Sequence, residues 1–220
     1  MSCLIQVNNI SKSYNKLTVL KNISINFESG KIYGLIGRNG SGKTLLMKCI
    51  CGLISVTSGS ILINGSDISK RSLNEINIGA IIEQPGFLPN LSGYQNLKIL
   101  AKIKNIIGDK EIRKAMNLVG LDSDSRKKAG KYSLGMKQRL GIAQAIMENQ
   151  QILLLDEPMN GLDNSTVETI REIIAKLQKE GKTIIIATHY KEDIEILCDE
   201  VIELDNGCII NHIIKNNNHL

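Results

Sequence analysis

A glycine-rich stretch that ends in lysine and threonine has the residue types and the spacing needed to bind phosphate groups. Residues 37–44 match the pattern G-x-x-x-x-G-K-[ST] and read Gly37-Arg38-Asn39-Gly40-Ser41-Gly42-Lys43-Thr44. The glycines allow the backbone to turn until several N–H groups point at one anion. Lys43 would then reach the β- and γ-phosphates of a nucleotide, and the Thr44 hydroxyl would ligate Mg²⁺. Arg38 and Asn39 occupy unconstrained positions, so only their place in the loop is predicted and their side chains receive no role.

The residues on either side provide the context that this pattern requires. Residues 31–36 form a short, mostly apolar run, which predicts a strand. Residues 45–51 predict a helix. The helix would add the positive end of its dipole to the loop amides. The simpler alternative is a glycine-rich turn that ends in Gly-Lys-Thr by chance. Such a turn would require neither the strand before it nor the helix after it.

Two further strands end in residues that could do chemistry. Residues 151–155 predict a buried strand that is followed by Asp156 and Glu157, and residues 183–187 predict another that is followed by Thr188 and His189. Charges at the edge of a sheet cost desolvation energy unless they are paired. Ligands bind beyond the carboxyl ends of parallel strands, where a metal ion would take a carboxylate. The simpler alternatives are that Glu157 is only an acid at a helix start and that His189 is a hydrogen-bonded polar residue.

Residues 87–147, which precede both of these strands, differ in character from the α/β segments on either side, and their pattern predicts helices. Ser92-Gly93-Tyr94-Gln95 has the form of a capping box, and apolar residues follow at helical spacing. A second helix runs through Ile112 and Val119, and a third has Ser133 as its N-cap. We therefore expect residues 87–147 to form a helical subdomain, and residues 1–86 and 148–220 to form an α/β core.

Short patterns predict the remaining elements. Strands are expected at residues 4–7, 23–27, 61–64 and 79–84, and a helix is expected around residues 167–177. Between the first two strands, residues 12–16 are polar, so Tyr14 is expected in a turn. Asp205-Asn206-Gly207 between apolar runs predicts a β-hairpin. Asn216, Asn217 and Asn218 predict a loose end.

Composition limits the classes of function that fit. The 220 residues are 42% hydrophobic and 22% charged with a net charge of +5, which fits either one large α/β domain or one domain with an insertion. With 3% aromatic residues and no Trp, platforms for stacking on nucleic-acid bases are scarce. No apolar run reaches the roughly 18 residues that span a bilayer, and no signal peptide is visible. Five cysteines without metal-ligand spacing indicate buried free thiols, so a cytoplasmic location is expected.

Together these motifs resemble the ATP-binding-cassette (ABC) family over nearly the whole chain. Residues 37–44 correspond to the family's P-loop, Asp156 ends a Walker-B-type strand, and Glu157 is the acid that follows. Gln84 resembles the Q-loop glutamine and His189 the switch histidine. The remaining matches are the signature at Tyr132–Gln138, the D-loop at Gly161–Asp163 and the aromatic A-loop residue at Tyr14.

The signature departs from the family's Leu-Ser-Gly-Gly-Gln. Ser133 and Gly135 keep two positions, but Leu134 replaces a glycine and Met136 replaces the glutamine. This variant resembles a branch that contains bacitracin-resistance and lantibiotic-immunity exporter ATPases. A serine hydroxyl and backbone N–H groups at a helix N-terminus can still bind a γ-phosphate.

The resemblance implies a fold, a set of cofactors and a set of residue roles. The fold would be a P-loop nucleotide-hydrolase core with a mainly parallel sheet, an N-terminal antiparallel part and an inserted helical subdomain. The cofactors would be ATP and Mg²⁺. ATP would be bound by the loop residues, by Thr188 and by Tyr14, which would stack on adenine. Mg²⁺ would be held by Thr44, Asp156 and Gln84.

The implied catalytic group contains Lys43, Gln84, Glu157 and His189. Glu157 would deprotonate the attacking water and His189 would contact the γ-phosphate. Two cassettes would assemble head to tail, with Ser133 and Gly135 acting in trans on the ATP of the other subunit.

Transport would further require a separate membrane-spanning permease, for which residues Gln84–Pro89 are the candidate docking surface. The chain would therefore lie on the cytoplasmic face of the cell membrane and would power export of a peptide antibiotic or a drug. Two alternatives remain: a soluble ABC ATPase that acts on nucleic acid or the ribosome, although no direct contact with nucleic acid is expected, and a regulatory ATPase without a transport role.

Overall fold

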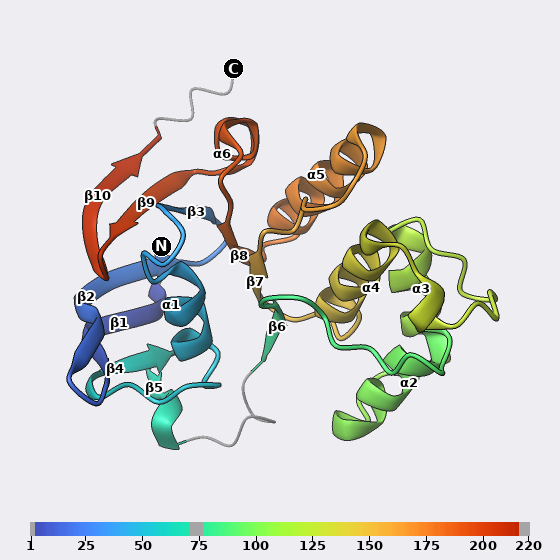
Figure 1. The fold of residues 1–220 in the computed structure, drawn as a ribbon, viewed down its shortest axis with the longest axis horizontal. Coiled ribbons are helices and arrows are strands. Elements are labelled where there is room, and N and C mark those ends of the chain that lie inside the picture. The colour runs from blue at the N-terminus through green and yellow to red at the C-terminus, as the bar shows by residue number, and fades with distance from the viewer. Residues whose placement is uncertain (1–2, 71–76, 216–220) are drawn as a thin grey trace.

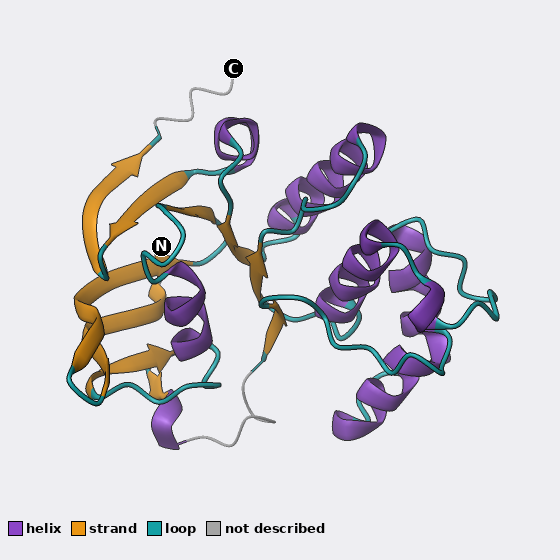
Figure 2. Cartoon of the chain, viewed as in Figure 1, coloured by secondary structure: helices purple, strands orange, loops and turns teal. Residues whose placement is uncertain are grey.

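A computed structural model of the protein describes residues 3–70 and 77–215. The expected loose end at Asn216–Asn218 lies outside these ranges. Within them, the chain forms two sheets, helices that pack against the larger sheet and a separate group of helices (Figures 1 and 2). The predicted mixture of a mainly parallel sheet, an N-terminal antiparallel part and a helical segment is therefore confirmed.

The larger sheet has six strands in the order β10-β9-β3-β8-β7-β6. All neighbouring pairs are parallel except the hairpin of β9 and β10. Its strands are β3 (Ile32–Ile36), β6 (Ile78–Ile81), β7 (Ile152–Asp156), β8 (Thr183–Ala187), β9 (Glu200–Asp205) and β10 (Cys208–Ile214). The central strands are continuous apolar runs because both of their faces are buried.

The smaller sheet is antiparallel and contains the N-terminal strands in the order β2-β1-β4-β5. Its strands are β1 (Cys3–Tyr14), β2 (Leu17–Glu28), β4 (Ser58–Ile63) and β5 (Ser66–Asp67). The expected turn at residues 12–16 is wrong in part, because β1 continues to Tyr14, which pairs with Leu17. Hydroxyl groups satisfy this polar end of the strand, since Ser13 N–H donates to Thr57 Oγ1 at 3.0 Å.

Two cores lie on opposite faces of the larger sheet. Helix α1 (Lys43–Ile50) packs between the two sheets, against Leu154 and Ile185. Helix α5 (Asn164–Lys179) covers the other face, against Leu153 and Ile184. Alternate residues of β7 and β8 thus belong to different cores, as the two-residue period of a strand requires. A short helix, α6 (Lys191–Leu197), follows β8 and was not expected.

Three helices form a separate group at the right of Figure 1: α2 (Gly93–Lys104), α3 (Asp109–Leu118) and α4 (Leu134–Ile146). The capping box at Ser92 and Gln95 is present as expected, and Ser133 Oγ caps α4 by accepting from Met136 N–H. Short 3₁₀ turns lie at Ile68–Lys70 and Ala129–Lys131. The subdomain boundaries at residues 87 and 147 remain a prediction.

The described cysteines agree only in part with the expectation of buried free thiols. Cys49, Cys51 and Cys198 are free and buried, and burial raises the pKa of the Cys198 thiol to about 12. Cys208 is free and partly exposed. Among residues 3–70 and 77–215, no helix is both long enough and apolar enough to cross a membrane.

A glycine allows the helical group to approach the sheet closely. Gly79 lies on β6, and a Cβ atom built there would stand 1.8 Å from the backbone oxygen of Ala145 on α4. Because protein interiors are close-packed, this contact fixes the separation of α4 and β6.

Replacement of Gly79 by alanine should therefore lower the free energy of unfolding by about 3 kcal/mol, since the new methyl group meets a backbone atom that cannot rotate away. Urea unfolding midpoints measure the effect. Gly86→Ala is the control, because a Cβ atom there has no neighbour within 4 Å. Equal midpoints for the two variants would mean that α4 moves away from β6 without cost.

Candidate functional site

The predicted phosphate-binding loop joins β3 to α1, as expected. Gly37, Gly40 and Gly42 have φ values of +142°, +80° and +110°, which residues with a Cβ atom rarely adopt. A Cβ atom at Gly37 would stand 2.1 Å from the carbonyl oxygen of Leu204 on β9. Glycine is therefore required here both for its φ angle and for the close approach of another strand.

The side chains of Lys43 and Ser41 in this loop have buried polar atoms. The Lys43 side chain is largely buried, and its Nζ donates to the carbonyl oxygens of Gly37 at 2.8 Å and Arg38 at 3.2 Å. The Ser41 hydroxyl oxygen is also buried and has no hydrogen-bond partner among the described residues. Buried polar atoms without partners are costly, so the loop has unused capacity to bind a polar group. Arg38 and Asn39 are exposed.

The loop borders an open cavity of about 400 Å³. Its lining comes from Val19, residues 39–45, Asp156 and Glu157. Val19 on β2 was not predicted, and nothing in its local sequence distinguishes it. Tyr14 is 48% exposed and is not part of this lining; the ammonium of Lys12 lies 4.9 Å from its ring centroid.

Two side chains that could ligate a metal ion through oxygen meet in the lining of this cavity. The Thr44 hydroxyl on α1 donates to Asp156 Oδ2 at 2.7 Å, although the two residues are 112 positions apart. This contact arises because β3 and β7 are both parallel neighbours of β8. The two acids predicted from the end of β7 are thus brought to the loop.

Glu157 and His189 face each other across the ends of β7 and β8. Glu157 Oε2 lies 2.8 Å from His189 Nδ1. Glu157 has a φ of +48°, and its N–H donates to Ala187 O at 2.8 Å. A left-handed backbone conformation costs energy at a residue other than glycine, and such residues are found most often at functional sites. The carboxylate is therefore held beside both the loop cavity and the histidine.

A buried ionic cluster supports the turn that carries His189. The Thr188 hydroxyl is buried and donates to Asp193 Oδ2 at 3.1 Å. Arg171 on α5 donates to Asp193 Oδ1 through Nε at 2.9 Å and Nη2 at 2.7 Å. The cofactor contact expected for Thr188 remains a prediction. Arg171 was missed because its only sequence signal was a charge beside the apolar residues of the expected helix, and Asp193 was missed because no helix was expected around it.

The signature residues lie apart from this cavity, since none of its lining comes from α4. Ser133 is exposed at the start of α4. Leu134 is 54% exposed, and its side chain packs against Gly161, where an added Cβ atom would stand 2.6 Å from Leu134 Cδ2. Gly135 approaches the same turn, because its Cβ atom would lie 2.8 Å from Gly161 O. Ser133 and Gly135 therefore do not meet the glycine-rich loop of their own chain.

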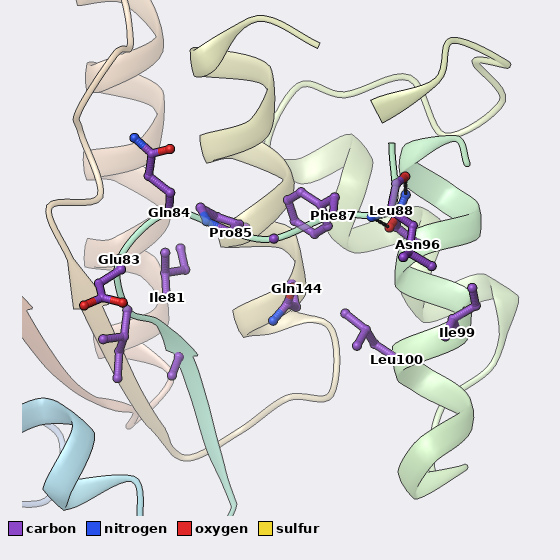
Figure 3. A pocket seen from close by; sticks show the side chains of 14 residues that line it. Ile81, Glu83, Gln84, Pro85, Phe87, Leu88, Asn96, Ile99, Leu100 and Gln144 are labelled. Atoms are coloured by element: carbon purple, nitrogen blue, oxygen red, sulfur yellow. Dashed lines mark hydrogen bonds between the residues drawn. The ribbon is translucent and has the colours of Figure 1, made fainter. Parts of the chain in front are cut away.

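Gln84 is exposed just beyond β6 and borders a second hollow of about 300 Å³ (Figure 3). Phe87, Leu88, Ile99 and Leu100 provide its apolar wall. The Leu88 backbone is fixed there, since its N–H donates to Asn96 Oδ1 at 2.7 Å. Gln84 is not part of the lining of the loop cavity.

Residues 20–160 match the family model of ABC transporters. The chain is 48% identical to an uncharacterised ABC transporter ATP-binding protein of Bacillus subtilis, YybJ, with 93% of this chain and 94% of that protein aligned. It is 42% identical to the bacitracin transport ATP-binding protein BcrA of Enterococcus faecalis, with 97% and 70% aligned. It is also 42% identical to the lantibiotic transport ATP-binding protein SrtF of Streptococcus pyogenes, with 94% and 89% aligned. A solved dimeric bacterial ABC transporter cassette superimposes with a TM-score of 0.89 at 26% identity, covering 96% of this chain and 98% of that one.

The substitution Asp193→Ala should lower the free energy of unfolding by about 3–5 kcal/mol, because it leaves the Arg171 guanidinium buried without its main partner. Chemical denaturation measures this change. Glu192→Ala is the matched control, since Glu192 pairs with the same guanidinium at 3.2 Å from an exposed position. It should cost less than about 1 kcal/mol. Similar losses for both variants would contradict the importance of the buried contact.

Proposed function

Because the chain belongs to the ABC transporter ATP-binding family, we propose that its ATPase activity powers export of a peptide antibiotic or drug through a separate membrane-spanning partner. The observation that carries this proposal is the Glu157 carboxylate, which borders the loop cavity and pairs with His189 at 2.8 Å. The bacitracin and lantibiotic transport proteins, at 42% identity, support the class of cargo.

ATP would bind with its phosphates in the glycine-rich loop. The Lys43 ammonium, now on two loop carbonyls, would exchange one of these for phosphate oxygens, and the Ser41 hydroxyl would find a partner. Loop amides and the start of α1 favour an anion at the same place. Tyr14 and Thr188 would contact other parts of the nucleotide.

Mg²⁺ fits the donors at the base of the cavity. Thr44 and Asp156 offer a hydroxyl and a carboxylate, which are the hard oxygen ligands this ion prefers. No cluster of three or more His, Cys, Asp or Glu side chains suited to a metal occurs in the described ranges. Mg²⁺ typically keeps waters and substrate phosphates as its other ligands, so two protein donors suffice. When bound, it would neutralise charge on the phosphates.

Hydrolysis would then rest on Glu157 and His189. The Glu157 carboxylate would orient a water molecule and accept its proton, and the His189 ring would hold that carboxylate and contact the γ-phosphate. Positioning and charge stabilisation account for most of the catalysis of phosphoryl transfer. Gln84 would respond to bound metal and water from the end of β6.

Assembly of two cassettes would complete each site. Ser133 and Gly135 are displayed at the exposed start of α4, away from the loop of their own chain. A head-to-tail arrangement with a second ABC subunit would bring them to the other subunit's γ-phosphate. The dimeric bacterial cassette with a similar fold supports such an assembly.

The hollow next to Gln84 is the proposed docking surface for the membrane partner, near residues Gln84–Pro89. Leu88 and Ile99 are exposed apolar side chains on its wall, and Asn96 fixes the loop that carries Leu88 (Figure 3). A partner segment with one apolar face would cover them. The chain would then lie against the cytoplasmic face of the membrane.

Glu157→Gln tests the assigned base. The turnover number for ATP should fall by about 10²–10⁴-fold, because the amide cannot accept a proton, whereas ATP affinity should be retained. Steady-state phosphate release and nucleotide titration measure the two quantities, and size-exclusion chromatography should show an ATP-held dimer. Glu172→Gln, an exposed carboxylate on α5, is the control and should leave turnover unchanged. A Glu157→Gln protein that turns over ATP at the unmodified rate would disprove the assignment.

Leu88→Asp tests the docking surface. A charge in this apolar hollow should reduce co-sedimentation with membranes that contain the co-expressed partner by about tenfold, because it would be desolvated without a counter-charge. Basal ATPase activity should be unaffected. Ile210→Asp on β10 provides the control, since Ile210 is 58% exposed and Leu88 is 53% exposed. Equal co-sedimentation of the two variants would mean that the membrane partner does not dock at this hollow.

A further inference from the structure

Gln138 connects the signature helix to the backbone of the proposed base. It lies on α4, five positions after Ser133, and is 7% exposed. Its side-chain Nε2 donates to Glu157 O at 3.1 Å and to Pro158 O at 3.1 Å. Both hydrogens of the amide are thus directed at the turn that follows β7.

The backbone at Glu157 needs such support. Of the described residues other than glycine with positive φ, all are asparagine except Glu83 and Glu157. Asparagine tolerates this conformation because its short side chain bonds locally, whereas glutamate lacks that compensation. Strained backbone persists only where surrounding contacts over-determine it.

Contacts on both sides of the residue provide this constraint. The N–H of Glu157 is held by Ala187 O at 2.8 Å, on β8. Its carbonyl oxygen accepts from Gln138 and also from Asn160 N–H at 3.2 Å, within the turn itself. Of the two donors to this carbonyl oxygen, Gln138 is the one that comes from another element, and it also donates to the next carbonyl, that of Pro158. The orientation of the Glu157 side chain toward His189 follows from that backbone.

We propose that Gln138 is a positioning residue for ATP hydrolysis, which holds the Glu157 backbone so that the carboxylate stays beside the loop cavity and His189. The inference rests on the proposed role of Glu157. Because Ser133 begins the same helix, the element that serves the other subunit's ATP also holds the base of its own site. Gln138 itself touches neither reacting atom.

Gln138→Met removes both donors and keeps the length of the side chain. The turnover number should fall by roughly tenfold to a hundredfold, since small misplacements of a catalytic group have effects of that size. KM for ATP and the dissociation constant for nucleotide should change less than about threefold, because the phosphate loop is untouched. Arg139→Met is the matched control. Arg139 lies on the same helix as Gln138 and donates a hydrogen bond of 2.8 Å to Gly120 O; the variant loses this bond and should keep its turnover number.

A double-mutant cycle separates positioning from general stability. Once Glu157→Gln has removed the carboxylate, adding Gln138→Met should lower single-turnover hydrolysis by less than about twofold, because no base is left to misplace. If the second substitution again costs tenfold or more, Gln138 acts on the protein in general and the proposal is overturned. An unchanged turnover number for Gln138→Met alone also overturns it.

Gln138→Asn replaces the methionine variant if the latter does not fold, since the shorter amide stays polar but cannot reach both carbonyls. Its turnover number should fall in the same way, and full activity would refute the inference. The two proposals fail differently. Full activity of Glu157→Gln would disprove the assignment of Glu157 as the base. Loss of activity in Glu157→Gln together with full activity in the Gln138 variants would disprove only the positioning role of Gln138.

Discussion

The parallel pairing of β3, β8 and β7 is the constraint on which the rest of the site depends. The carboxyl ends of parallel strands lie at the same end of the sheet, so the segments that follow these strands meet there. Leu35 and Asp156 both pair with Ala187, which aligns the ends of the three strands. The glycine-rich loop, the two acids and His189 therefore follow the strands at the same end of the sheet, and Thr44 comes within 2.7 Å of Asp156.

Close packing makes this arrangement rigid. Alternate side chains of β7 and β8 fill two separate cores, one beneath α1 and one beneath α5. Fully burying one such aliphatic side chain contributes about 1.5–3 kcal/mol, so a shift of either strand would be costly. At the turn between β9 and β10, Gly207 N–H donates to Ser41 O at 3.0 Å, which ties the loop to this hairpin. A rigid loop needs little reorganisation when an anion binds.

Most elements could be predicted because their signals are local. Ser92 and Ser133 cap helices through side chains that act within three residues, and Asn206-Gly207 forms its hairpin wherever apolar runs flank it. Tyr14 shows the opposite case. Its neighbours are polar, which predicted a turn, but pairing with Leu17 and a bond from Ser13 N–H to Thr57 kept it in a strand. Strand propensity depends on such partners more than on the residues themselves.

The sequence by itself predicted the chemistry of the site: a glycine-rich loop, acids after one apolar strand and a histidine after another predict a phosphate-binding site through their residue types and spacing. Only the tertiary structure decided what holds those residues. Gln138 reaches Glu157 across 19 positions and Arg171 reaches Asp193 across 22, while Val19 joins the cavity from another sheet. A long polar side chain selects its partner by distance and burial in the folded chain, and neither quantity leaves a pattern in the sequence.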